Sequence, residues 1–273
     1  MKESMLRHGE IERSIITKYR KPIWRKFIKA VKDYNLVKEG DHIAICISGG
    51  KDSMLLAKCM EELKKHGGIN FDLTYLVMDP GYKDVSIEKI KENAEILNID
   101  ITMFKTDIFS IVQEQTSGSP CYLCARMRRG CLYKRAQELG CNKIALGHHF
   151  NDVVETILLS MFYGGEYKSM RPILNSTNFE GMELIRPLYL VKEEDIISWT
   201  KASDLTFINC ACMLTEKENE GKRLEIKNLI KTLKEVNPNI EYNIFASTEN
   251  VNLDTILTYK TNDKKHNFLD GRE

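Results

Sequence analysis

The stretch that decides the fold runs from residue 42 to residue 53 and reads HIAICISGGKDS. Its first half, 42–48, is a short and continuous apolar run, which predicts a strand buried on both faces. An amphipathic helix is expected over 53–65. Between them lies a turn of two glycines followed by charged residues. Glycines let backbone N–H groups approach an anion closely, and a helix N-terminus adds its positive dipole end, so we expect a phosphate-binding loop.

Each polar side chain of this loop has a chemical use. Lys51 supplies a point charge, and Asp52 is able to hold a Mg²⁺ ion that bridges phosphate oxygens. Ser48 and Ser53 can donate their hydroxyls to phosphate, although Ser53 is equally suited to cap the helix. The ordinary P-loop pattern and the dinucleotide fingerprint G-x-G-x-x-G are both absent here.

Strand and helix patterns alternate after this loop. The expected strands are 71–78, 101–105 and 143–146, and the expected helices are 85–97, 123–139 and 152–162. This alternation predicts an α/β fold, a parallel Rossmann-like sheet with helices on both faces. Beyond 164–165 the pattern changes to a hairpin of 171–174 with 183–186, then to helices near 193–203 and 223–236. The polar tail from Thr261 is expected to be loose.

The N-terminal part is basic, although the chain as a whole is not. Residues 11–37 read as one helix, and its stretch 18–32 holds seven lysines and arginines and no acid. A run of like charges is often only a solvated helix face, but seven basic residues without an acid favour a surface that binds a polyanion. Over all 273 residues, however, 40 basic side chains balance 39 acidic ones, so net charge neither requires nor excludes nucleic acid. We expect a basic N-terminal helical segment 1–38, an α/β domain 39–215 that carries the phosphate loop, and a C-terminal helical extension with a loose tail 216–273.

Apolar runs such as 43–47 are far shorter than a membrane span, and the first ten residues, MKESMLRHGE, lack the apolar core of a signal peptide. We therefore expect a soluble cytoplasmic protein, without a membrane partner. In that compartment the eight cysteines should be reduced. Four of them stand singly in apolar segments and are expected to be buried thiols: Cys46, Cys59, Cys131 and Cys141.

The other cysteines form two close pairs. Cys121 and Cys124 open a basic helix, CYLCARMRRGCLYKR, while Cys210 and Cys212 lie far along the chain. The first pair is compatible with a redox couple, with half of a zinc site or with part of an iron–sulfur site. The second pair could complete a zinc site, whereas three cysteines with an open fourth position would suit a [4Fe–4S] cluster with one reactive iron.

A second motif, GHHFND, occupies residues 147–152 at the end of the fourth strand. Paired histidines suggest a metal, but adjacent side chains rarely chelate one ion. The alternative is a strand-end cap, with Asp152 as a carboxylate at a helix N-terminus. Both motifs follow the carboxyl ends of strands, where open parallel sheets bind ligands, so we expect them to meet in space.

The loop resembles that of the PP-loop, or N-type, ATP pyrophosphatases, whose signature after a strand is SGGKDS. Three motifs together, SGGKDS at 48–53, SPCYLCARMRRG at 119–130 and GHHFNDVVET at 147–156, resemble the TtcA-type tRNA thiolases, which make 2-thiocytidine. The resemblance implies a Rossmann-like adenine nucleotide alpha hydrolase (PP-loop) core with a basic N-terminal helix and a small C-terminal elaboration. It also implies that ATP is cleaved between its α and β phosphates while the substrate is adenylated.

Carried over to this chain, the resemblance implies three sets of site residues. The ATP phosphates would bind at Ser48, Gly49, Gly50, Lys51, Asp52, Ser53 and Gly147, and the catalytic residues would be Lys51, Asp52 and Asp152. The ligands of a [4Fe–4S] cluster would be Cys121, Cys124 and Cys212; Cys212 is preferred to Cys210 because the later helix then aligns better. The implied partners are tRNA, a sulfur donor (sulfide or a cysteine desulfurase) and a second copy in a homodimer.

Two departures from the family pattern matter. Asn151 stands where the family usually has aspartate, which leaves one carboxylate in the second motif, and residues 210–222 diverge around the second cysteine pair. We interpret the chain as an ATP-dependent tRNA sulfurtransferase that forms AMP and pyrophosphate. The competing hypotheses are a PP-loop enzyme that adenylates a small molecule, a zinc-stabilised RNA-binding protein, and a cluster-based desulfurase that needs no ATP. The last two leave the intact SGGKDS loop unexplained.

Overall fold

The computed structural model describes residues 2–114, 120–207, 219–261 and 264–270. Its strands are β1 (His42–Ile47), β2 (Asp72–Asp79), β3 (Ile101–Lys105), β4 (Lys143–Ala145), β5 (Ile173–Asn175), β6 (Glu183–Ile185), β7 (Thr258–Thr261) and β8 (Lys264–Asn267). Its α-helices are α1 (Lys2–Ile16), α2 (Arg25–Asp33), α3 (Lys51–His66), α4 (Asp84–Ile96), α5 (Ile108–Glu114), α6 (Pro120–Glu138), α7 (Phe150–Gly164), α8 (Glu193–Ala202), α9 (Asn219–Val236) and α10 (Ile240–Ala246).

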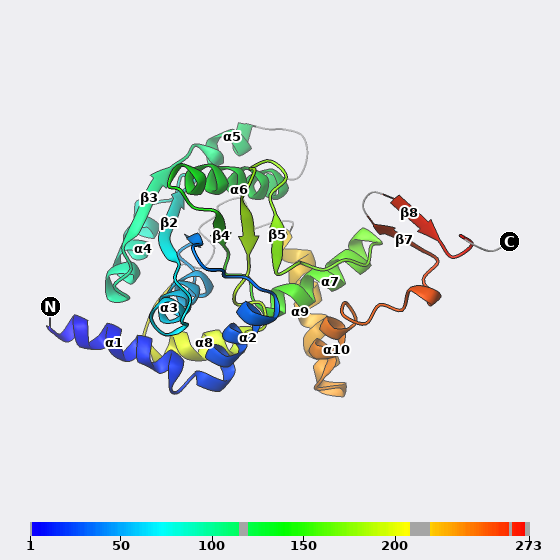
Figure 1. Ribbon diagram of the computed structural model, residues 1–273, viewed down its shortest axis with the longest axis horizontal. Helices are drawn as coiled ribbons and strands as arrows, with labels where there is room; N and C mark the ends of the chain where they lie inside the picture. The colour runs from blue at the N-terminus through cyan, green and yellow to red at the C-terminus, as the bar shows by residue number, and fades with distance from the viewer. Residues whose placement is uncertain (1, 115–119, 208–218, 262–263, 271–273) are drawn as a thin grey trace.

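Within these ranges six strands form one sheet in the order β3-β2-β1-β4-β6-β5 (Figure 1). All neighbouring pairs are parallel except β5 with β6, the antiparallel hairpin that the sequence predicts. From β1 the chain moves outward through β2 to β3, then returns to place β4 on the other side of β1. This reversal between β1 and β4 is the position at which open α/β sheets form a ligand crevice.

Successive side chains of the strands pack alternately into two hydrophobic layers, one on each face of the sheet. Ile43, Ile45 and Ile47 of β1 pack into the larger core, together with apolar residues of α1, α2, α3, α4 and α8. Ala44 and Cys46 point to the opposite face, where Tyr133 and Ala136 of α6 cover them. Because each strand supplies apolar residues to both faces, the predicted α/β fold with helices on both sides is confirmed.

A further apolar cluster joins α7 to the C-terminal helices. Val153 and Ile157 of α7 pack with Ile226 and Ile230 of α9, and with Phe245 of α10. This cluster seats α9 and α10 beside α7, away from the α6 layer (Figure 1). As a result, side chains from the last third of the chain reach the carboxyl edge of the sheet.

The single helix predicted over 11–37 is wrong in its middle. The chain instead forms α1, a π-helical turn at Arg20–Trp24, and then α2. Pro22 has no N–H and its ring clashes with the carbonyl four residues earlier, so the α-helical ladder cannot run through it. Backbone hydrogen bonds that span five residues replace this ladder, from Tyr19 N to Ser14 O (2.8 Å) and from Trp24 N to Tyr19 O (3.2 Å).

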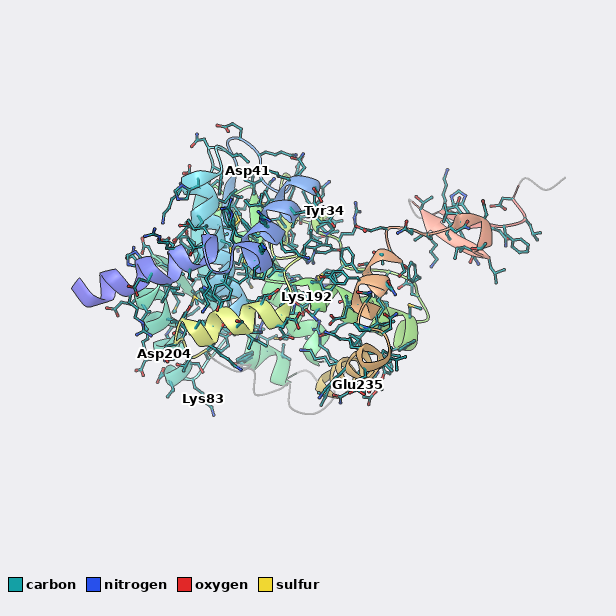
Figure 2. All side chains as sticks on the ribbon, turned by 90° about the horizontal axis from the view of Figure 1, so that it is seen from below. Tyr34, Asp41, Lys83, Lys192, Asp204 and Glu235 are labelled. Carbon is teal, nitrogen blue, oxygen red and sulfur yellow. The ribbon has the colours of Figure 1, made fainter. Side chains whose placement is uncertain are left out.

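The C-terminal region also differs from expectation. Helix α10 was not predicted, and Lys264–Asn267, expected to be loose, pairs as β8 with β7. The C-terminal arm, residues 251–270, projects from the body in both views (Figures 1 and 2). The division into segments 1–38, 39–215 and 216–273 stays a prediction. No helix in the described part of the chain is long and apolar enough to span a membrane.

Candidate active site

The SGGKDS loop joins β1 to α3 at the carboxyl edge of the sheet. Gly49 has φ +83°, a left-handed conformation that favours glycine, and Gly50 is the N-cap of α3. The hydroxyl of Ser53 accepts a hydrogen bond from the Ser48 N–H (3.2 Å) and donates to the Gly50 carbonyl (2.9 Å). Ser53 therefore closes the loop rather than capping the helix, and it is buried while it does so.

The second motif reaches the same place, as expected. Gly147 follows β4 and packs so closely on α3 that a Cβ there would lie 3.0 Å from the Asp52 carbonyl carbon and the Ser53 nitrogen. His149 is the N-cap of α7, and its N–H donates to the Asp152 carboxylate (3.0 Å). His149 Nε2 lies 3.9 Å from the Asp52 carboxylate. Both motifs thus meet at the reversal point of the sheet.

Charged residues from later helices complete this cluster. Lys51 lies 3.2 Å from the carboxylate of Asp52 and 3.2 Å from that of Glu193, the first residue of α8. From α9, Arg223 pairs with Glu155 (2.6 Å) and with Asp152 (3.2 Å). Neither Glu193 nor Arg223 was singled out from the sequence, because acids at a helix start and bases along a surface helix are ordinary.

The electrostatics of the cluster distinguish its two aspartates. Burial raises the pKa of Asp52, although His149 and Lys51 act in the opposite direction. Burial also opposes ionisation of Asp152, but His149, His148 and the backbone hydrogen bond outweigh it and lower the pKa. Lys51 keeps a raised pKa because Asp52 and Glu193 outweigh its burial. Asp52 Oδ1 is buried and accepts no hydrogen bond, although it lies 3.2 Å from the Lys51 ammonium group. A divalent cation would give this oxygen a direct ligand contact.

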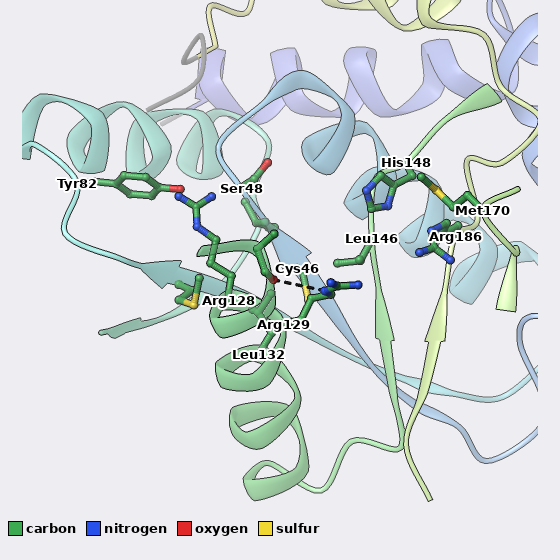
Figure 3. Close-up of a pocket in the computed structure, with 13 residues that line it drawn as sticks. Cys46, Ser48, Tyr82, Arg128, Arg129, Leu132, Leu146, His148, Met170 and Arg186 are labelled. Carbon is green, nitrogen blue, oxygen red and sulfur yellow. Dashed lines mark hydrogen bonds between the residues drawn. The ribbon is translucent and has the colours of Figure 1, made fainter. Parts of the chain in front are cut away.

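A pocket of about 480 Å³ opens beside this cluster (Figure 3). Its walls come from the ends of β1, β2 and β4 and from α6, and its lining includes Ser48, Arg128, Arg129, His148 and Arg186. Several buried nitrogens here have no hydrogen-bond partner, namely Arg128 Nε, Arg186 Nε and His148 Nδ1. Three guanidinium groups around an apolar floor suit a ligand with a flat ring and a negative charge.

The histidine in this pocket is neutral near physiological pH. Burial lowers the pKa of His148 to about 4, against the pull of Asp152. The guanidinium groups of Arg186 and Arg223 act in the same direction as burial. His148 therefore adds a hydrogen-bonding ring without adding charge.

The cysteines are only partly described. Cys121 and Cys124 lie one turn apart on α6, and Cys124 is buried in the same apolar cluster as Met78, which also lines the pocket. Cys210 and Cys212 lie outside the described residues, so the choice between them stays a prediction. Among the described residues no group of three acidic, histidine or cysteine side chains could hold a metal ion. Of the single cysteines, Cys46, Cys59 and Cys141 are buried as predicted, and Cys131 is half-buried.

Comparisons with known proteins agree with this geometry. The family model of the PP-loop domain matches residues 20–233. The chain is 38% identical over 251 residues to a tRNA-cytidine(32) 2-sulfurtransferase of Aliivibrio salmonicida, covering 91% of this chain and 81% of that protein. The protein of the same name from Geotalea uraniireducens is 37% identical over 226 residues, covering 82% of this chain and 88% of its own length.

Among solved structures, the fold is similar to that of the U34-tRNA thiolase NcsA from Methanococcus maripaludis, solved with its [4Fe-4S] cluster. The TM-score is 0.66, and the match covers 82% of this chain and 76% of that one. At 22% identity, this similarity supports the assignment of the fold alone.

Proposed function

Because the chain belongs to the PP-loop family and, within it, to the tRNA-cytidine(32) 2-sulfurtransferases, we propose that it thiolates a cytidine of tRNA at the expense of ATP. The motif-based resemblance is thereby confirmed. One observation supports the proposal above all others: the SGGKDS loop and the Asp152 motif converge at the reversal point of the sheet, beside an arginine-lined pocket. The small-molecule enzyme, the zinc protein and the desulfurase are not favoured.

The loop would bind the triphosphate. The N-terminus of α3 and the backbone N–H groups of Gly49 and Gly50 would face the phosphates, with the Gly50 N–H giving up its present partner, Ser48 Oγ (3.4 Å). Lys51 would exchange a carboxylate partner for a phosphate oxygen. Asp52 would hold Mg²⁺, since its buried Oδ1 lacks a hydrogen bond. The ion would neutralise charge on the phosphate oxygens. Asp152 would keep His149 and Arg223 in place around the reacting groups.

The chemistry proceeds in two displacements. The C2 carbonyl oxygen of cytidine attacks the α-phosphorus of ATP, an O–P bond forms, and pyrophosphate leaves with the electrons of the broken P–O bond. Lys51 stabilises the charge that develops on this leaving group. Sulfide then attacks C2, the C2–O bond breaks, and AMP departs while C2 becomes a thiocarbonyl. Sulfur enters and remains at the oxidation level of sulfide, so no reductant is needed. The target base must leave its stack to reach the pocket.

We propose Cys121, Cys124 and Cys212 as ligands of a [4Fe–4S] cluster. Cys121 and Cys124 lie three residues apart on α6, and Cys124 sits in an apolar environment next to the pocket, as a thiolate-ligated cluster requires. When bound, the cluster would present sulfide at an iron without a protein ligand. The sulfur donor that supplies it would be free sulfide or a cysteine desulfurase.

Basic surfaces would position the RNA without reading its sequence. On the N-terminal segment the exposed cations are Lys18, Arg20, Lys21, Arg25, Lys29 and Lys32. On α6 the exposed cations are Arg126, Arg129 and Lys134. Since tRNA is the substrate, we place the protein in the cytoplasm.

The proposal is tested with anaerobically reconstituted protein, ATP, Mg²⁺, sulfide and a tRNA that carries cytidine at position 32. We expect 2-thiocytidine by mass spectrometry, with one AMP and one pyrophosphate per thiolated base. The same tRNA with uridine at position 32 is the matched control and should stay unmodified. Thiolation without ATP, or thiolation of free cytidine at the same rate, would overturn the proposal.

Iron and sulfide analysis tests the cluster ligands. We expect about four irons per chain, lost in Cys121→Ala, Cys124→Ala and Cys212→Ala. The iron should be retained in Cys210→Ala and in Cys131→Ala, which removes a half-buried thiol from the same helix. One zinc and no iron would contradict the cluster.

We also propose a homodimer in which the C-terminal arm contributes to the interface. Within the described part of the arm every side chain but His266 is exposed, and the exposed apolar residues are Val251, Leu253, Ile256, Leu257, Tyr259, Phe268 and Leu269. An isolated two-stranded hairpin is marginally stable, so such an arm is expected to pack on another surface. Light scattering should report a dimer for the wild type and a monomer for Leu257→Asp. Val85→Asp, at an exposed position on α4, should stay dimeric.

A further inference from the structure

The side chain of Asn151, in the first turn of α7, links three helices. Its Oδ1 accepts a hydrogen bond from the backbone N–H of Glu193 at the start of α8 (2.9 Å). Its Nδ2 donates to Oε1 of Glu241 in the first turn of α10 (2.9 Å). Glu241 is only 3% exposed and lies 2.9 Å from the ammonium group of Lys234. Asn151 therefore uses both ends of its amide in a largely buried setting.

The first of these contacts fixes the start of α8 and therefore the position of Glu193. The N-terminal N–H groups of a helix have no partner within it, and Lys192, the N-cap of α8, supplies no side-chain cap. Asn151 satisfies one of these groups from outside the helix. The carboxylate of Glu193 in turn lies 3.2 Å from Lys51 Nζ and 3.3 Å from Lys227 Nζ. A chain of direct contacts thus runs from Asn151 through Glu193 to the lysine of the phosphate loop.

The second contact determines which way the amide points. Only a side chain with an acceptor at one end and a donor at the other can satisfy both the Glu193 N–H and the Glu241 carboxylate. An aspartate at 151 would keep the first bond, but it would place a second carboxylate against Glu241. Repulsion between the two would push the start of α7 away from α10 and release the start of α8.

We propose that Asn151 is a positioning residue for Lys51, acting through Glu193, and that its orientation depends on Glu241. The inference rests on the proposed use of the loop for ATP, and it concerns how this chain holds the loop lysine before the nucleotide arrives. Asn151 itself touches neither nucleotide nor base in this assignment.

The test measures binding of a non-hydrolysable ATP analogue by calorimetry, with Mg²⁺ and without tRNA. Asn151→Asp should weaken binding roughly tenfold, the scale of one lost charge-assisted contact. The double variant Asn151→Asp with Glu241→Gln should recover affinity to within about twofold of the wild type, because the new amide at 241 donates to the new carboxylate at 151. Glu235→Gln, on the exposed end of α9, is the matched control and should bind like the wild type.

A second comparison separates positioning from simple loss of stability. In a Lys51→Met background Asn151→Asp should have no further effect on analogue binding, because the residue through which it acts is missing. An equal loss in both backgrounds, or a double variant no better than Asn151→Asp, would overturn the inference. If the wild type does not bind the analogue, the proposed function fails; if it binds and Asn151→Asp binds equally well, only the inference fails.

Discussion

Replacing Gly147 by alanine should damage both stability and nucleotide binding. The added Cβ would lie 3.0 Å from the Asp52 carbonyl carbon, 3.0 Å from the Ser53 nitrogen and 3.2 Å from the Asp52 oxygen. Carbon atoms in ordinary contact are about 3.5–4.0 Å apart. All three neighbours belong to the backbone of α3, so no side-chain rotation can relieve the contact. The end of β4 and the start of α3 must therefore separate by roughly 0.5–1 Å.

The size of the effect follows from this crowding. Overpacking a well-packed site costs about 1–3 kcal/mol. With a urea dependence of about 3 kcal/mol per molar, the unfolding midpoint should fall by roughly 0.3–1 M. The displaced backbone carries the phosphate loop, and misplacement of about 1 Å costs up to a hundredfold in rate. We therefore expect the KM for ATP to rise about tenfold or more.

Urea unfolding followed by fluorescence, together with steady-state pyrophosphate release, measures both effects. The matched control is Gly164→Ala in the last turn of α7, where a new Cβ would meet nothing within 4 Å. Alanine is favoured over glycine in a helix by about 0.5–1 kcal/mol, so this control should be as stable as the wild type or more so. If Gly147→Ala keeps the wild-type midpoint and KM, the close approach of β4 to α3 does not constrain the loop, and the reasoning is refuted.

Three further predictions concern pH and metal. Burial opposes ionisation of Glu12, but Lys65 and Lys58 outweigh it and lower the pKa of Glu12 from 4.5 to about 2. The ionised Glu12 therefore contributes fully to the stability of the fold above pH 4.5, and this contribution is lost as pH falls toward 2. Unfolding midpoints should therefore drop less steeply between pH 5 and 2.5 in Glu12→Gln than in the wild type. Burial lowers the pKa of His148 from 6.5 to about 4, so the unfolded state binds a proton before the folded state does. The free energy of unfolding should therefore decrease as pH falls from 6.5 toward 4. The same pH dependence of the free energy of unfolding in His148→Asn would contradict this. Chelation of Mg²⁺ should abolish pyrophosphate release, and Asp52→Asn should raise the Mg²⁺ concentration for half-maximal rate roughly tenfold; an unchanged Mg²⁺ requirement would exclude Asp52 as a ligand.

Local patterns were sufficient where one segment decides its own structure. The apolar run 42–47 with its glycines predicted β1, the loop and α3 to within two residues, because a buried strand and a helix N-terminus have distinct short-range signals. The meeting of this loop with the 147–152 motif was also predictable, since both follow strands of one parallel sheet. The break at Pro22 was in the sequence too, but the regular apolar stripe of 11–37 concealed it.

Other features depend on contacts between distant segments. Glu193, Arg223 and Glu241 read as ordinary helical residues in their own segments. Only the packing of α8, α9 and α10 brings Glu193 to Lys51 and brings Arg223 and Glu241 to the first turns of α7. Asn151 looked like the loss of a carboxylate, whereas in the fold its amide joins two helices and Glu193 supplies a carboxylate beside Lys51.

The sequence by itself therefore determined the alternation of β1–β4 with α3, α4, α6 and α7, the phosphate loop and the family, because these depend on residue types at short fixed spacing. The tertiary structure alone decided which charges share the site. Within the site, ion pairs and hydrogen bonds join residues up to 142 positions apart, as in Lys51 with Glu193, and no local pattern encodes such a distance. Their energies depend on burial and geometry, which exist only once the helices have packed.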